Sequence, residues 1–95
     1  MNDMEATRDE RPWALVSGAS GGLGRAFSRH LASCGVNLVV TGRRHDVLDD
    51  LADQLTTRYG IQTIAHPCDI SSASERLALV NEIAGRGIII DTLVN

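Results

Sequence analysis

The chain has 95 residues, 43% of them hydrophobic, which fits one small domain with a modest core. Its 12 acidic residues outnumber nine basic ones, and the basic residues, all arginines, are scattered along the chain, which argues against a nucleic-acid or anionic membrane surface. Cys34 and Cys68 form no CxxC pair and no apolar run reaches the ~18 residues of a membrane span, so we expect a cytoplasmic protein with free thiols and no membrane contact.

The first elements are expected from the polar and apolar pattern of residues 1–35. Residues 1–12 are charged and lack the apolar core of a signal peptide, so they predict a disordered polar tail. Residues 13–17 form a short apolar run that ends at a glycine cluster, as a buried parallel strand does. From Gly22 to the stop at Gly35 the apolar residues have helical spacing. This pattern predicts that the buried face of the helix contains Leu23, Ala26, Phe27, His30 and Leu31.

The rest of the chain continues the alternation of strands and helices. Residues 36–41 form a continuous run rich in β-branched residues and predict a second strand, and residues 48–59 predict a second amphipathic helix that ends at Gly60. Residues 61–68 predict a third strand, and Ser72 with Glu75 has the capping-box spacing that opens a third helix. Residues 88–95 are typical of a fourth buried strand. The apolar face expected for the third helix consists of Leu77, Val80, Ile83 and Ala84.

This alternation predicts an α/β fold, the β-α-β-α-β-α-β portion of a Rossmann-like doubly wound parallel sheet with strand order 3-2-1-4. No internal repeat or second domain boundary interrupts residues 13–95. In an open parallel sheet, ligands bind at the carboxyl ends of the strands. We therefore expect the functional residues to lie in the loops that follow the strands.

The first such loop, Ser17 to Gly24, contains four glycines between a strand and the start of a helix. Glycine allows a sharp turn and lets a pyrophosphate approach the free N–H groups at the positive end of the helix. The spacing Gly18-x3-Gly22-x-Gly24 is neither GxGxxG nor a nucleotide triphosphate loop. A ligand-free turn is the alternative, although it needs only one or two such glycines. The residues expected to hold the cofactor here are Gly18, Ser20, Gly21, Gly22, Leu23 and Gly24, whereas Arg25 is expected on the solvent face of the helix.

These glycines resemble the TGxxxGxG cofactor motif of the short-chain dehydrogenases/reductases, with Ser17 where the family more often has Thr. The resemblance covers the chain from residue 13 to Asn95, and its further motifs lie after the later strands. After the second strand, the position where an NAD-dependent dinucleotide fold has an acidic residue is Gly42, followed by Arg43. A guanidinium suits a 2′-phosphate, so NADP(H) is expected over NAD(H), unless Arg43 is an ordinary loop charge.

The resemblance also implies roles at the ends of the third and fourth strands. Asp69 would accept from the exocyclic amine of adenine and Ile70 would pack on the ring, although Asp69 could instead help to begin the third helix. The run DTLVN is similar to the sequence that leads into the family's NNAG motif, with Asn95 as its first residue, beside the adenosine. Asn95 is therefore the last of the expected cofactor-binding residues.

For the full-length parent the resemblance implies a homo-oligomeric NADP(H)-dependent oxidoreductase, which reduces a ketone or aldehyde or oxidises the matching alcohol by hydride transfer. The chain contains no Lys, and therefore no Tyr-x-x-x-Lys, so the catalytic Ser, Tyr and Lys of the family are expected beyond Asn95. Residues 13–95 are then expected to be the amino-terminal part of a dinucleotide-binding domain, truncated after the fourth strand and inactive alone.

Two other functions stay open at this point. The chain could be a non-catalytic cofactor-binding fragment, or a truncated gene product that folds only with a partner. A methyltransferase-like Rossmann domain is a third possibility, which Arg43 opposes because adenosylmethionine carries no 2′-phosphate. His30 and Cys34 are four residues apart on one predicted helix, but no second pair follows, so no metal site is expected.

Overall fold

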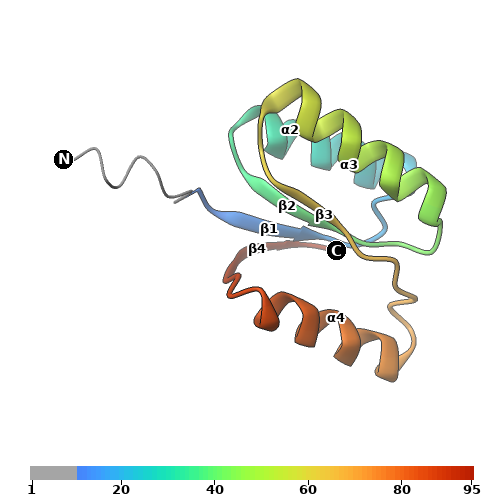
Figure 1. Ribbon diagram of the computed structural model, residues 1–95. Coiled ribbons are helices and arrows are strands. Elements are labelled where there is room, and N and C mark those ends of the chain that lie inside the picture. Colours follow the sequence, from blue (N-terminus) through green and yellow to red (C-terminus); the bar gives the residue numbers. More distant parts are fainter. Residues whose placement is uncertain (1–10) are drawn as a thin grey trace.

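The computed structural model describes residues 11–95 as a four-stranded sheet with helices on both faces (Figure 1). The strand order is β3-β2-β1-β4, and all the paired strands are parallel. This arrangement confirms the predicted α/β, Rossmann-like sheet and its order 3-2-1-4. In chain order the elements are β1 (Trp13–Val16), α2 (Gly22–Ser33), β2 (Asn37–Val40), α3 (His45–Tyr59), β3 (Thr63–Ala65), α4 (Ala73–Gly85) and β4 (Ile90–Val94).

The predicted polar tail falls largely outside the described residues, since it comprises residues 1–12 and the description begins at residue 11. Its last two residues contact the domain. An Arg11 guanidinium nitrogen donates to the Gly60 carbonyl at 3.1 Å, and the Pro12 carbonyl accepts from the Asn37 N–H at 2.9 Å.

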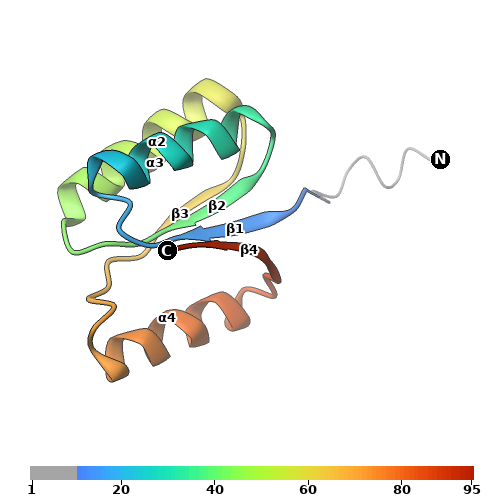
Figure 2. The ribbon, with the colours of Figure 1, turned by 180° about the vertical axis from the view of Figure 1, so that it is seen from behind.

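The helices form two layers around the sheet. Helices α2 and α3 lie on one face and α4 lies on the other, as the two opposite views show (Figures 1 and 2). The register aligns Val16 of β1 with Val40 of β2 and with Val94 of β4. The carboxyl ends of these strands therefore meet along one edge, which brings the loops that follow them together.

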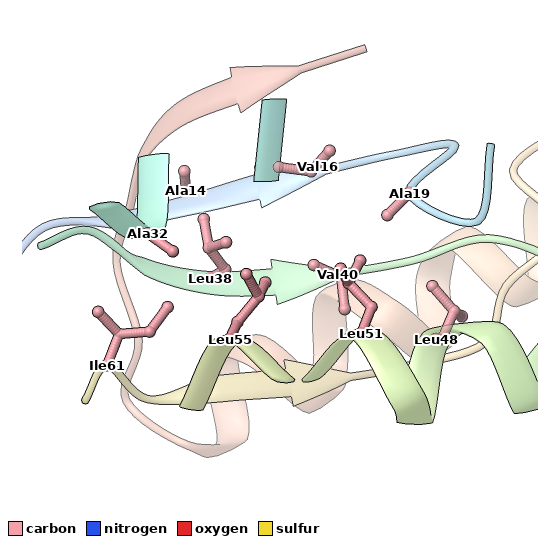
Figure 3. Packing of buried hydrophobic residues seen from close by; sticks show 10 residues of the cluster. All are labelled: Ala14, Val16, Ala19, Ala32, Leu38, Val40, Leu48, Leu51, Leu55 and Ile61. Atoms are coloured by element: carbon pink, nitrogen blue, oxygen red, sulfur yellow. The ribbon is translucent and has the colours of Figure 1, made fainter. Parts of the chain in front are cut away.

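The larger hydrophobic core lies between the sheet and the pair α2 and α3 (Figure 3). Leu48, Leu51 and Leu55 of α3 pack there against Leu38 and Val40 of β2, as the predicted spacing of the second helix requires. A smaller cluster under α4 contains Val39, Cys68, Leu79 and Ile83. Within residues 11–95, no helix combines the length and the hydrophobicity that a membrane crossing needs.

The buried face of α2 differs from the predicted one. Ser28 and Ala32 are buried, whereas Leu23 is 74% and Phe27 is 44% exposed. Ala26 and His30 are also exposed and Leu31 is only partly buried. The reason is close packing, because Gly24, one turn before Ser28, lies directly against the backbone of Gly18 and Ala19. Small residues at this spacing let the helix approach the sheet, so the larger side chains lie on its outer side.

The third predicted helix, α4, begins as expected but also turns a different face inward. The N–H of Glu75 donates to the Ser72 hydroxyl at 3.3 Å, which confirms the cap. Leu79 and Ile83 are buried, but Leu77 is 61% and Val80 is 58% exposed, so the predicted face was wrong except at Ile83. Ala84 is exposed as well. Because α4 has apolar residues on different sides, two of its faces could pack against the sheet, and the hydropathy pattern alone does not show which face is buried.

The third and fourth strands are shorter than the sequence predicts. Of residues 61–68 only Thr63–Ala65 form β3, and the strand ends before Pro67. The last strand was expected to be buried, but Leu93 is 63% exposed because β4 is one of the two edge strands of the described sheet. The register of β4 shifts next to Asp91, whose carboxylate accepts from the N–H of Trp13 at 3.2 Å.

Candidate functional site

A cavity of about 500 Å³ lies at the carboxyl ends of β1, β2 and β3. Three separate segments of the chain line it, each in the loop that follows one of these strands. A cavity at the strand ends of an open parallel sheet is where such folds bind ligands. The lining residues are Ser17, Gly18, Ser20, Gly21, Thr41, Gly42, Arg43, Arg44, Cys68, Asp69, Ile70 and Ser71.

The glycine loop turns the chain from β1 into α2 beside this cavity. Gly18 has a φ of +65°, a conformation that favours glycine, and its carbonyl accepts from the N–H of Gly21 at 3.1 Å. The loop is fixed to β2, because the N–H of Ala19 donates to the Thr41 carbonyl at 2.9 Å. The N-cap of α2 is Gly21, which supplies no side-chain cap, and the first turn holds no acidic residue. The positive end of α2 is therefore available to an anion.

The glycines of the loop have different structural roles. A Cβ on Gly24 would lie 2.2 Å from the Gly18 carbonyl oxygen and 2.8 Å from the Ala19 Cα, so only glycine fits there. A Cβ on Gly22 would meet nothing within 4 Å. Gly22 and Leu23 are exposed in the first turn of α2 and do not line the cavity. Gly24 packs against the backbone of Gly18 and Ala19 in the loop and does not line the cavity.

The segment after β2 places a positive charge at the cavity. Arg43 is exposed and lines it, and among residues 11–95 no carboxylate lies within 4 Å of the Arg43 guanidinium. Arg44 also lines the cavity, and its guanidinium is 3.9 Å from the Asp46 carboxylate. A Cβ on Gly42 would lie 2.8 Å from the Ser20 hydroxyl oxygen. The absence of a side chain at position 42 therefore leaves room for Ser20 beside Arg43.

The segment after β3 is held in place by hydrogen bonds from α4. Asp69 Oδ1 accepts from the Ser71 N–H at 3.0 Å and from the Ser71 hydroxyl at 2.6 Å. The Asp69 N–H donates to the Glu75 carboxylate at 2.8 Å, and an Arg76 guanidinium nitrogen donates to the Ile70 carbonyl at 2.7 Å. Glu75 thus turns back toward Asp69, and this network presents Asp69 and Ile70 to the cavity.

Hydrogen bonds from Ser71 also set the acidity of Asp69. The Ser71 hydroxyl, and then its backbone N–H, hold the pKa of Asp69 below its ordinary value of 3.8, and the positive charge of Arg43 acts in the same direction. A carboxyl whose folded-state pKa is lowered contributes stability that is present above the unfolded pKa and is lost as the pH falls through the folded pKa. For Asp69 this window lies below pH 3.8. The carboxylate therefore stays an acceptor at neutral pH.

We expect Ser71→Ala to raise the pKa of Asp69 toward 3.8, because the variant loses the hydroxyl that contributes most to the shift. Nuclear magnetic resonance of the Asp69 side-chain carboxyl carbon during a pH titration measures this value. Ser74→Ala, in the first turn of α4, is the control and should leave the pKa of Asp69 unchanged. An identical titration curve in Ser71→Ala would show that the Ser71 hydroxyl does not stabilise the carboxylate.

Asn95 lies at the end of β4 and is tied to the first residue of the glycine loop. The Ser17 hydroxyl donates to the Asn95 side-chain oxygen at 2.8 Å and lies 3.3 Å from the Val94 carbonyl. Asn95 does not line the cavity itself. Of the ten residues expected to bind a cofactor, the structure places six on the cavity, namely Gly18, Ser20, Gly21, Arg43, Asp69 and Ile70.

The sequence analysis missed several lining residues, above all Thr41 and Cys68. Both occupy the last positions of predicted strands, and that place at a strand end was the available signal. Arg25, expected on the solvent face of its helix, is instead partly buried between α2 and α3, and its Nε is buried with no partner in the described part of the chain. A second cavity, of about 460 Å³, is lined by α2 and α3 alone. It contains Arg29, Asp53, Gln54, Leu55, Thr57, Arg58 and Tyr59, none of them an expected site residue.

The chain is similar in sequence to known proteins. The sequence model of the short chain dehydrogenase family matches residues 12–95. A very-long-chain 3-oxoacyl-CoA reductase of Aspergillus fumigatus is 47% identical over 51 residues, which are 54% of this chain and 15% of that protein.

Two solved structures share the fold. An alcohol dehydrogenase from the archaeon Thermococcus sibiricus, complexed with 5-hydroxy-NADP, has a TM-score of 0.84 and 30% identity, over 88% of this chain and 36% of that one. The L-sorbose reductase from Gluconobacter frateurii, complexed with NADPH and L-sorbose, has a TM-score of 0.86 and 26% identity, over 90% of this chain and 32% of that one. The chain thus spans about a third of the length of these two enzymes.

Proposed function

The chain belongs to the short-chain dehydrogenase family, and from this premise we propose that it forms the NADP(H)-binding part of an oxidoreductase. The observation that carries the proposal is the convergence of three segments on one cavity. They bring together an uncapped helix start, a guanidinium with no carboxylate within 4 Å among residues 11–95 and an ionised carboxylate. These groups match the pyrophosphate, the 2′-phosphate and the adenine of NADP(H), respectively.

The residues would act as follows. Gly18, Ser20 and Gly21, with the amino end of α2 at Gly22 and Leu23, would hold the pyrophosphate by backbone N–H groups and by the helix dipole. Arg43 would grip the 2′-phosphate with two parallel hydrogen bonds. Asp69 would accept from the exocyclic amine of adenine while Ile70, 46% exposed, packs on the ring. When bound, the dinucleotide supplies or accepts a hydride.

For the whole protein we propose the reduction of a ketone or aldehyde, or the oxidation of the matching alcohol. A homo-oligomer is part of this proposal, and the exposed Leu77 and Val80 of α4 offer apolar surface for association. The 95 residues contain no Lys, so the family's Tyr-x-x-x-Lys proton donor cannot be among them. The second candidate function for these 95 residues is a cofactor-binding unit without catalysis of its own.

Replacing Arg43 tests the cofactor assignment. We expect Arg43→Leu to weaken NADPH binding about 10- to 100-fold and to leave NADH binding unchanged, because the lost hydrogen bonds go to a charged phosphate that NADH lacks. Fluorescence titration of each reduced cofactor measures both affinities. Arg44→Leu is the matched control, since Arg44 has Asp46 beside it. An equal loss of NADH affinity in Arg43→Leu would remove the basis for the 2′-phosphate assignment.

A further inference from the structure

Thr41 lines the cavity, and its hydroxyl has no hydrogen-bond partner among residues 11–95. Its backbone is hydrogen-bonded both to β1 and to the glycine loop. The Thr41 N–H donates to the Val16 carbonyl at 3.0 Å, and the Thr41 carbonyl accepts from the Ala19 N–H at 2.9 Å. The residue is 1% exposed, and its Oγ1 is buried with no partner among the described residues. A buried hydroxyl without a partner is costly, so its presence in a binding site requires a reason.

The side chain of Thr41 is on the α4 side of the sheet. Its backbone continues the pairing of β2 with β1, and side chains alternate between the faces of an extended chain. Val39, two residues earlier, packs under the sheet with Cys68, and both Thr41 and Cys68 line the cavity. The Thr41 side chain therefore lies on the same face of the sheet as Val39 and Cys68, in the lining of the cavity to which Asp69 also belongs.

We propose that Thr41 is a positioning residue for the adenosine half of the dinucleotide, whose binding gives the hydroxyl its missing partner. The proposal rests on the proposed function and adds a residue to that site. Because protein atoms cover Oγ1, the hydroxyl reaches the ligand only if the side chain turns about its Cα–Cβ bond. Because NADPH and NADH share the adenosine, the hydroxyl contributes to the affinity for both and does not discriminate between them. In this respect it differs from Arg43.

Three substitutions in the 95-residue chain test this role. Thr41→Val keeps the shape and removes the hydroxyl, Thr41→Ser keeps the hydroxyl, and Thr63→Val is the control. Thr63 Oγ1 is also buried with no partner within residues 11–95, but Thr63 lines a different cavity, beside Trp13 and Ile88. NADPH, NADH and adenosine 5′-monophosphate are the probes, titrated by fluorescence or calorimetry. Thermal unfolding without ligand is measured in parallel.

We expect Thr41→Val to weaken the binding of all three probes by the same factor, about 3- to 10-fold, and to raise the unfolding temperature of the ligand-free protein. Thr41→Ser should restore the affinity, and Thr63→Val should raise the unfolding temperature alone. Unchanged affinity in Thr41→Val, an equal loss in Thr63→Val, or a loss confined to NADPH would overturn the proposal. If the unmodified chain bound none of the three probes, the proposed function itself would fail; if it bound them and Thr41→Val bound them equally well, only this inference would fail.

Discussion

Gly24→Ala should destabilise the fold by about 2–4 kcal/mol, although exchanging glycine for alanine within a helix normally stabilises by about 1 kcal/mol. The sign reverses because the added Cβ would lie 2.2 Å from the Gly18 carbonyl oxygen and 2.8 Å from the Ala19 Cα. Both contacts are with backbone, which cannot move aside as a flexible side chain can. Either α2 separates from the loop or the loop loses its conformation.

Urea unfolding measures this change, and Gly22→Ala is the matched control in the same helical turn. A Cβ on Gly22 meets nothing within 4 Å, so this variant should be at least as stable as the unmodified chain. A Gly24→Ala variant with an unfolding free energy within about 0.5 kcal/mol of the starting protein would show that the close approach of α2 to the loop is not required.

The second large effect concerns binding. We expect Gly22→Val to lower NADPH affinity by about 100-fold or more while the fold is kept. The branched side chain would enter the open space before the first turn of α2, where the pyrophosphate is expected to meet the backbone N–H groups. Circular dichroism and unfolding measurements check the fold, and fluorescence titration checks the affinity. Unchanged NADPH binding in a folded Gly22→Val protein would mean that the loop does not hold the phosphates.

Much of the fold could be predicted because local patterns carry it. Three such patterns each specify one element: the apolar run at residues 13–17, the continuous apolar strand before Thr41 and the helical spacing of residues 48–59. Alternating strands and helices then leave few topologies, since parallel crossovers are right-handed. The Ser72 cap was visible as a four-residue pattern, and the structure contains it.

The faces of α2 and α4 could not be predicted in the same way. Hydropathy favours Leu23 and Phe27, whereas packing favours the small residues Ser28 and Ala32, because Gly24 already lies on the loop backbone. That contact joins residues of a turn and a helix, so its geometry appears only once both are built. The face of the sheet on which the Thr41 side chain lies could not be predicted either. A continuous apolar strand has no alternation of polar and apolar residues that would show which face each side chain occupies.

The most direct measurement is a nuclear magnetic resonance titration of the isotopically labelled chain with NADPH. The expected result is that the backbone amide signals of Gly18, Gly21, Arg43 and Asp69 shift together, while those of residues 53–59, at the second cavity, stay in place. NADH should move the glycine signals less at the same concentration and leave Arg43 nearly unmoved, because it has no 2′-phosphate. Shifts confined to residues 53–59, or no shifts at millimolar NADPH, would contradict an NADP(H) site formed by the glycine loop and Arg43.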